Sequence, residues 1–487
     1  MSFRIGSHIS NPQINIVILG GGISGLAAAH SAISSRKPGV SVTLLEAKPR
    51  YGGWVETLHY EDGCTFEVGP RTIRPVGLPG KRTLELVSEL GLETKVIPVT
   101  RQHPSASKRY IYAKGRICLL PNSLVSLFTK QPPLTSSIVS SLIKEPFQTK
   151  SAEPDETVHS FFKRRVGSEI ADYFADAFCH GIYASGSKEL SVGTCFPSLL
   201  EYERRYGSLS MGALFSKKAK IPLDDCLLYK RSQKEKWSIW TLKDGLQGFV
   251  EAWSNYLVEK GLNTRLNTKC HSLIFSENNK VLCQTEDGVV EADHVISSLA
   301  SKDLAALLPD RNQKLSNLLK KIQNVTVGVV NLEFEGKQLP VDGFGLLVPS
   351  CEAMDILGIV FDSCVVEDGR GNTKLTVMMG GSKYESLFGN PDNTDKDYLL
   401  HRALQGVTQT LGIKKKPIKC CVSIQKECIP QYQVGHLELV ESIHTEICKD
   451  QLPLTIVGSS YRAVGINDCI FNAQTEVENI MNFRFVS

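Results

Sequence analysis

Near the start of the chain, the pattern of apolar and polar positions is first that of a strand, then that of a helix, and then that of a strand again. Ile14–Leu19 is a short apolar, β-branched run of the kind found in buried parallel strands. Ile23–Ala32 is rich in alanine and leucine and predicts a helix, and a second apolar run, Val40–Leu45, ends at Glu46. The pattern therefore predicts a βαβ unit with parallel strands.

Three distant segments continue this α/β pattern. Asp293–Ile296 and Leu454–Val457 predict strands that run into small residues, and Val464–Ile466 is expected to open a helix. We therefore expect one sheet to be assembled from widely separated pieces of the chain.

Residues 121–210 carry amphipathic helical patterns instead. Within them, LPNSLVSLFTKQPPLTSSIVSSLI alternates apolar and small polar positions and is interrupted at Pro132 and Pro133. Two interpretations stay open: a globular pair of helices with surface serines, or an amphipathic patch that lies in a membrane interface. No stretch approaches 18 consecutive apolar residues, so any membrane contact is expected to be peripheral.

Composition and charge narrow the class of protein. With 487 residues and 42% hydrophobic content, the chain is long enough for two or three domains with large cores. A net charge of +4 is far from the basicity of a nucleic-acid-binding protein, and we expect no nucleic-acid partner. The first fourteen residues hold one arginine and no acid, a composition like that of a transit peptide but too short to assign one.

The fourteen cysteines predict no metal site. They are scattered from Cys64 to Cys469 without a C-x-x-C pair, and the cluster Cys420, Cys421 and Cys428 suits neither zinc nor a disulfide. We expect reduced and mostly buried thiols.

A glycine motif follows the first predicted strand. Gly20, Gly22 and Gly25 form G-x-G-x-x-G, which allows a tight turn, a close backbone approach to a pyrophosphate and close packing of helix on strand. The helix N-terminus would face the phosphates, and Glu46 would accept hydrogen bonds from a ribose. Further glycine-bearing loops follow in RYGGW and FEVGPR, and they favour FAD over NAD.

Several motifs resemble those of a known family. GGGISG, EAKPRYGGW and FEVGPR are similar to flavin-dependent amine oxidases, phytoene desaturases and protoporphyrinogen oxidases. GPRTIRP, EPDETVHSFFKRRVG, CHGIYASGSKELSV, TCFPSLLE, KECIPQY and VGSSYRAVGINDCI sharpen the resemblance to the oxygen-dependent protoporphyrinogen oxidase family of animal mitochondria. The resemblance runs from Asn15 into the C-terminal segment and covers essentially the whole chain.

The resemblance implies an α/β fold: a Rossmann-like FAD-binding domain of the amine oxidase type, a mixed-sheet substrate domain and a helical membrane-binding domain. The FAD-binding domain would comprise residues 11–95, 235–300 and 431–487. Residues 96–120 and 301–430 would form the substrate domain, and residues 121–210 the membrane-binding domain.

The same resemblance implies an activity and a setting. The reaction would be the six-electron oxidation of protoporphyrinogen IX to protoporphyrin IX in haem biosynthesis, with non-covalent FAD, oxygen as acceptor and hydrogen peroxide as product. A quinone is the other acceptor considered. The protein would be a homodimer, attached peripherally to the mitochondrial inner membrane on its intermembrane-space side, and in contact with ferrochelatase.

The resemblance also places substrate-binding residues. Arg109 falls where the family binds a substrate carboxylate, and it is preferred over Lys108 because guanidinium can bind a carboxylate through two hydrogen bonds. The family's apolar clamp and the glycine whose carbonyl faces the ring system fall on Phe344, Leu347, Val360, Met378 and Gly181. Without the resemblance, Arg109 reads as a solvent-facing charge and the clamp positions as core strand residues.

The implied flavin contacts come from all three predicted pieces of the FAD-binding domain. They are Gly20, Gly21, Gly22, Ile23, Ser24, Gly25, Glu46, Trp54, Gly69, Pro70, Arg71, Thr72, Cys270, Ser459, Val464, Gly465 and Ile466. Arg71 either contacts substrate or braces the flavin loop. One departure from the family is Ala463, where glycine is common.

No catalytic residue is assigned. His59, His103, His159 and His180 lie in or near the motifs, but no acid stands at a telling spacing from any of them, and we expect structural roles. The chemistry would belong to the flavin, while the carbonyl near Gly181 is a hypothesis for orienting the pyrrole hydrogens. The alternatives are a flavin amine oxidase, which usually shows a covalent flavin cysteine or an aromatic cage, and a non-catalytic FAD-bound scaffold.

Overall fold

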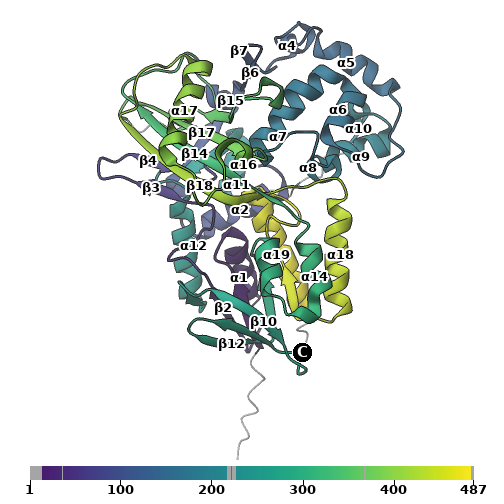
Figure 1. The fold of residues 1–487 in the computed structure, drawn as a ribbon, viewed down its shortest axis with the longest axis vertical. Helices are drawn as coiled ribbons and strands as arrows, with labels where there is room; N and C mark the ends of the chain where they lie inside the picture. The colour runs from purple at the N-terminus through teal and green to yellow at the C-terminus, as the bar shows by residue number, and fades with distance from the viewer. Residues whose placement is uncertain (1–13, 36, 217–220, 222–225, 367–368, 484–487) are drawn as a thin grey trace, which may run out of the picture.

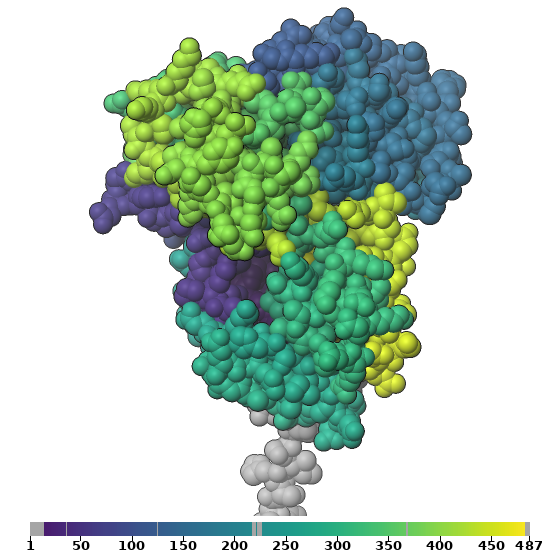
Figure 2. Space-filling model, viewed as in Figure 1, coloured from purple at the N-terminus to yellow at the C-terminus, as the bar shows by residue number. Residues whose placement is uncertain are grey.

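The computed structural model describes residues 14–35, 37–216, 221, 226–366 and 369–483. The N-terminal segment that resembles a transit peptide lies almost entirely outside these residues. Figure 1 shows a lower body around α1 and β2, an upper body around β14 and β17, and a helical body beside it that contains α5 and α6. The space-filling view in Figure 2 shows the same three regions, with the helical body in blue.

The lower body is built on a five-stranded parallel sheet in the order β19-β13-β1-β2-β9. Its strands come from three distant parts of the chain, which confirms the expected assembly. Their bounds are β1 Ile14–Leu19, β2 Val40–Leu45, β9 Asn263–Arg265, β13 His294–Ser297 and β19 Leu454–Ile456.

Both faces of this sheet are covered, which explains why β1 is continuously apolar. Ile16 and Ile18 pack toward α1, α2, α12 and α19, while Val17 and Leu19 pack toward a second layer of α13, α14, α18 and a three-stranded sheet. The helices of the first layer are α1 Ile23–Ser34, α2 Gly77–Glu89, α12 Gln247–Glu259 and α19 Ile466–Phe483. The second layer comprises α13 Ser301–Leu307, α14 Gln313–Leu319, α18 His436–Lys449, β10 Cys270–Phe275, β11 Val281–Thr285 and β12 Gly288–Ala292.

The upper body is a seven-stranded mixed sheet in the order β18-β14-β17-β16-β15-β6-β7. All neighbours are antiparallel except β15 and β6. The strands are β6 Tyr110–Ala113, β7 Arg116–Leu119, β14 Asn324–Phe334, β15 Gly345–Leu347, β16 Ile356–Val360, β17 Thr373–Gly381 and β18 Lys419–Pro430. One face packs on α16 (Tyr384–Phe388) and α17 (Lys396–Leu411).

Short helices make up the third body, and serine or threonine side chains mark the start of five of them. Ser123, Ser137, Thr157, Ser191 and Ser208 each cap a helix by accepting a hydrogen bond from a first-turn amide. The helices are α4 Leu124–Phe128, α5 Ile138–Lys144, α6 Val158–Val166, α7 Asp176–Tyr183, α8 Val192–Cys195, α9 Pro197–Tyr206 and α10 Leu209–Phe215, with a 3-10 turn, η2, at Glu145–Phe147. The small polar positions in the sequence are thus helix starts as well as surface residues.

A buried ionic cluster holds these helices together. Arg165 pairs with Glu145, and Glu203 bridges Arg164 and Arg165. Burial opposes ionisation of Glu145, but hydrogen bonds from Ser208, from two backbone amides and from Arg165 hold its pKa at about 2. The helical body is therefore an ordered unit with its own polar interior.

The predicted α/β class is confirmed, with a parallel sheet in one body and a mixed sheet in the other. Among the described residues, no helix is long and apolar enough to cross a membrane. The predicted domain boundaries stay predictions.

Candidate functional site

The turn between β1 and α1 can be made only by glycines. A Cβ on Gly25 would lie 1.9 Å from the carbonyl oxygen of Gly20, and Gly20 itself has a φ of +95°. Helix α1 therefore packs directly on the end of β1, as the glycine motif predicts.

The N-terminus of α1 has the features of an anion site. Gly22 is its N-cap and provides no side-chain hydrogen bond, and no acid lies in the first turn. Gly22 also forms a bridge with Gly52, and a Cβ on Gly53 would lie 3.2 Å from the Cα of Gly22. The first-turn amides and the helix dipole are thus available to a phosphate, and the crossing loop is itself made of glycine.

Glu46 lies beside the glycine turn, as the motif requires. Its side chain is buried, with Oε2 accepting from the Gly21 amide at 2.6 Å and Oε1 accepting from the Lys48 amide at 2.8 Å. A ribose diol would hydrogen-bond to these same carboxylate oxygens. The donors, the acid and the close backbone together fit the adenosine diphosphate part of a dinucleotide.

Two more loops reach the same region. A Cβ on Gly69 would lie 1.8 Å from the Trp54 carbonyl oxygen, so the segment carrying Pro70 and Thr72 runs directly against the segment after β2. Trp54 is 39% exposed, with the Lys48 ammonium 5.6 Å from its ring centroid. The exposed indole beside the glycine turn is free to contact a ligand.

Arg71 is a brace between the two bodies. Its guanidinium donates to Asp362 Oδ1 at 2.6 Å and to Thr376 Oγ1 at 2.5 Å, and it lies 3.4 Å from the Gly69 carbonyl oxygen. Thr376 in turn donates to Asp362, and Asn331 donates to the Glu67 carbonyl. The guanidinium is buried and paired with Asp362, which favours the bracing role over direct substrate contact.

The start of α19 approaches from the C-terminal piece. Tyr432 donates its hydroxyl hydrogen bond to the Ser459 carbonyl, and Val464 packs against the aromatic cluster around Tyr183 and Tyr432. Gly465 is exposed and directly precedes half-buried Ile466, the first residue of the helix. These residues present a second helix N-terminus near the glycine loops.

The backbone of Cys270 lies near Glu46, and its side chain is buried. It begins β10, two residues after Thr268, whose amide donates to the Glu46 carbonyl at 2.9 Å. Its thiol contacts Cys283 within the second core layer. Its backbone, not its thiol, is therefore the part close to Glu46.

Three predicted clamp residues share one face of the mixed sheet. Leu347, Val360 and Met378 are each partly exposed in strands that are otherwise buried. In the register, Leu347 and Met378 both lie opposite Gly358 on neighbouring strands, with Val360 two residues further along. A Cβ on Gly358 would lie 3.0 Å from Leu347 Cδ2, so the glycine leaves room for the Leu347 side chain on this face.

Gly181 and Phe344 border this face of the sheet. A Cβ on Gly181 would lie 2.7 Å from Leu347 Cδ2, so α7 packs closely there only because position 181 is glycine. The Arg109 guanidinium lies 5.7 Å from the Phe344 ring centroid. The structure thus brings Gly181, Leu347, Phe344 and Arg109 to one region.

Arg109 is half-buried and lacks a protein partner for its Nε. Burial, followed by the positive charge of Arg74, lowers the pKa of its guanidinium. An unpaired cation beside an apolar face is costly unless a ligand supplies negative charge.

One of the histidines has an acidic partner that its sequence spacing did not indicate. The His159 Nε2 lies 2.8 Å from Asp172 Oδ1, because a π-helical turn at Ile170–Ala175 carries the acid back over α6. His180 contacts the Val348 carbonyl through Nδ1 at 2.7 Å, and burial lowers its pKa. Both contacts fit the structural roles expected of these residues.

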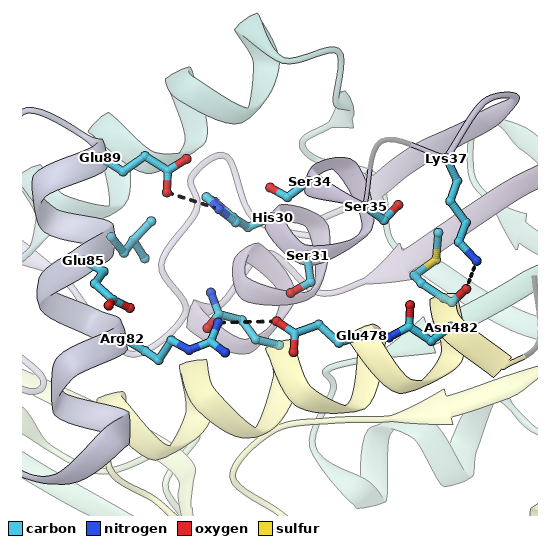
Figure 3. A pocket seen from close by; sticks show the side chains of 13 residues that line it. His30, Ser31, Ser34, Ser35, Lys37, Arg82, Glu85, Glu89, Glu478 and Asn482 are labelled. Atoms are coloured by element: carbon cyan, nitrogen blue, oxygen red, sulfur yellow. Dashed lines mark hydrogen bonds and ion pairs between the residues drawn. The ribbon is translucent and has the colours of Figure 1, made fainter. Parts of the chain in front are cut away.

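A cavity that no sequence motif indicated lies at the other end of α1. Figure 3 shows it between α1, α2 and α19, with a volume of about 290 Å³ and walls that include His30, Glu89, Arg82 and Glu478. His30 lies 3.5 Å from Glu89, and Arg82 lies 3.5 Å from Glu478. The cavity is separate from the glycine turn, which lies at the opposite end of the helix.

Within the described residues, no group of three or more His, Cys, Asp or Glu side chains is placed to hold a metal ion.

Comparisons with known proteins agree with this arrangement. The family model for flavin containing amine oxidoreductase matches residues 23–481. Protoporphyrinogen oxidase of Homo sapiens is 38% identical over 469 residues, covering 96% of this chain and 98% of that relative. Coproporphyrinogen III oxidase of Staphylococcus aureus is 27% identical, covering 96% and 99%. The crystal structure of an Exiguobacterium protein, provisionally named a protoporphyrinogen oxidase, matches with a TM-score of 0.78 at 23% identity, covering 96% and 98%, and shares the fold.

Proposed function

Because the chain belongs to the flavin-containing amine oxidoreductases and, within them, to the protoporphyrinogen oxidases, we propose that it oxidises protoporphyrinogen IX to protoporphyrin IX in haem biosynthesis. The observation that carries the substrate assignment is half-buried Arg109 beside the partly exposed apolar side chains of the mixed sheet. A porphyrinogen is a large apolar macrocycle with two propionates, so it needs an apolar wall and a cation.

The residues fit non-covalent FAD. The α1 amides would bind the pyrophosphate and Glu46 the ribose, while Trp54, the Gly69–Thr72 loop and the start of α19 would enclose the remainder. When bound, FAD supplies the electron-accepting ring for hydride removal. Cys469 speaks against a covalent link, since its thiol is buried and contacts the Ala463 carbonyl at 3.4 Å.

The protein residues would bind and orient the substrate. Arg109 would bind one propionate, and Phe344, Leu347, Val360 and Met378 would hold the macrocycle and exclude water. The Gly181 carbonyl would orient the pyrrole hydrogens. Six electrons leave the substrate in three two-electron steps, and with oxygen as acceptor each step releases one hydrogen peroxide. We propose no protein side chain as catalytic base.

A membrane attachment is proposed for the helical body. Apolar side chains are exposed on α4, α5, η2 and α10, which pack against one another in series. The patch comprises Val125, Phe128, Leu142, Ile143, Phe147, Met211, Leu214 and Phe215. Lys130 and Lys144 are exposed beside it and would meet lipid head groups.

Three further proposals rest on the family resemblance. The protein would be located at the mitochondrial inner membrane, on the intermembrane-space side. It would act as a homodimer and deliver its product to ferrochelatase.

One assay tests the activity. Purified protein loaded with FAD is given protoporphyrinogen IX in air, and porphyrin fluorescence is followed, with benzylamine-type substrates in parallel. We expect fluorescence to rise well above autoxidation and no amine turnover. A rise no faster than autoxidation would overturn the proposal, and amine turnover would favour the amine oxidases.

Arg109→Ala tests the division of the site. We expect weaker substrate binding with an unchanged flavin spectrum. Loss of bound flavin instead would show that Arg109 belongs to the cofactor site.

A further inference from the structure

Two arginines without acidic partners face the same region. Arg109 is half-buried, and its Nε has no hydrogen-bond partner. Arg74 is exposed, and it is close enough for its charge to act on Arg109. In the parts of the chain that the structure describes, neither guanidinium pairs with a carboxylate. Two other arginines of the region form ion pairs, Arg71 with Asp362 and Arg50 with Glu56.

A chain of contacts connects the loop that carries Arg74 to the Arg109 side chain. The loop that carries Arg74 is fixed to the mixed sheet by the bond from Arg71 to Asp362. The next residue back, Phe361, donates its amide to the Phe344 carbonyl at 3.0 Å. Phe344 in turn lies against the Arg109 guanidinium. The two arginines therefore come from different bodies, and the segments that carry them approach each other at the boundary between these bodies.

Hydrogen bonds hold the backbone of Arg74, and its side chain is exposed. Asn467, in the first turn of α19, donates to the Arg74 carbonyl at 2.7 Å. The preceding residue, Ile73, exchanges two backbone hydrogen bonds of 2.8 Å with Trp240. The guanidinium thus extends from a rigid point beside the start of α19, next to the proposed flavin site.

We infer that Arg74 is a second carboxylate anchor and that, with Arg109, it binds the edge of the porphyrinogen that carries both propionates. The inference rests on the proposed function. Two neighbouring cations without counterions repel each other, and a dicarboxylate edge neutralises both at once. A monocarboxylate would leave one cation uncompensated.

The arrangement also gives selectivity between porphyrinogens. Coproporphyrinogen carries four propionates, and with two of them on Arg74 and Arg109 the other two would face the apolar side chains of Val360 and Met378. Burying a carboxylate there without a partner is unfavourable. Arg74 therefore favours the dicarboxylate over the tetracarboxylate by fixing which edge of the macrocycle enters first.

The test compares Arg74→Gln with Arg101→Gln, a control at an exposed turn outside the site. Steady-state kinetics are measured with protoporphyrinogen IX and with its dimethyl ester, which lacks both charges. We expect Arg74→Gln to raise KM for the diacid about tenfold, or ~1.4 kcal/mol, with kcat within about twofold. KM for the ester should be the same in wild type and variant, and Arg74→Lys should restore part of the loss.

A structural role for Arg74 would give a different result. If the variant only disturbed the loop, KM for acid and ester would rise together and bound flavin would fall. That outcome, or an unchanged KM for the diacid, overturns the inference.

A binding measurement separates this inference from the proposed function. Protoporphyrin IX and its dimethyl ester are titrated into the FAD-loaded protein, and fluorescence gives Kd. If the wild type fails to oxidise protoporphyrinogen, the proposed function fails, yet an approximately tenfold weaker Kd of Arg74→Gln for the diacid alone would still support the anchor. An equal Kd for both ligands in wild type and variant would contradict it.

Discussion

Replacing Arg71 by glutamine should loosen the flavin site without weakening the substrate contacts. Arg71 is 8% exposed and donates to Asp362 and Thr376, so the change leaves a partly buried carboxylate without its cation. Removing one partner of such a pair costs about 3 kcal/mol. The entropy of unfolding is about 2.1 cal/mol/K per residue, which gives about 1 kcal/mol/K for 487 residues. We therefore expect Tm to fall by about 3 °C.

The loop from Gly69 to Thr72 is fastened to the mixed sheet through this pair, so bound FAD should also dissociate more readily. Asp362→Asn should produce the same loss, and the double variant should lose little more than either alone, because all three remove one interaction. The assay combines thermal melts, flavin release by fluorescence, and KM with excess FAD. A normal Tm and flavin affinity with a raised KM would refute the bracing role and place Arg71 on the substrate.

Three other outcomes follow from the structure. Gly25→Val should abolish FAD binding, since a Cβ there would lie 1.9 Å from the Gly20 carbonyl, and retention of flavin at wild-type levels would contradict the glycine-turn geometry. Burial raises the pKa of Glu67 to about 7, so the protonated carboxyl stabilises the folded state at low pH, and this stabilisation is lost as pH rises toward 7. Thermal melts of Glu67→Gln should therefore lack this part of the pH dependence of Tm. The same pH dependence of Tm in variant and wild type would refute the assignment. Phe147→Ser should weaken liposome binding about tenfold, because the Phe147 side chain is 87% exposed in the apolar patch. The matched control Val289→Ser changes a side chain on β12 that is 60% exposed, and it should leave liposome binding unchanged. Equal binding of both variants would argue against membrane attachment through the patch.

The local units of the fold could be predicted from sequence because their signals are local. The run before Gly20 and the run ending at Glu46 have the apolar continuity of buried parallel strands, and both are strands of the five-stranded sheet. The glycine spacing predicted the packing of Gly25 on Gly20. These features depend only on neighbouring residues and on sterics.

Contacts between distant segments could not be predicted in this way. Nothing near Asp362 in the sequence indicates that it binds Arg71, 291 residues away, and nothing near Arg74 indicates Arg109. The pairing of His159 with Asp172 depends on a π-helical turn that has no clear sequence signature. The clamp residues were indicated only by resemblance, because Leu347 and Met378 read as ordinary core positions until the register places Gly358 between them.

We propose that this chain oxidises a porphyrinogen fully and passes the electrons to oxygen. The most direct measurement follows protoporphyrin IX and hydrogen peroxide together in a sealed aerobic reaction started with protoporphyrinogen IX. We expect three peroxides for each porphyrin, and weaker substrate binding in Arg109→Ala with FAD still bound. Porphyrin formed at the rate of autoxidation, or peroxide formed without porphyrin, would contradict it.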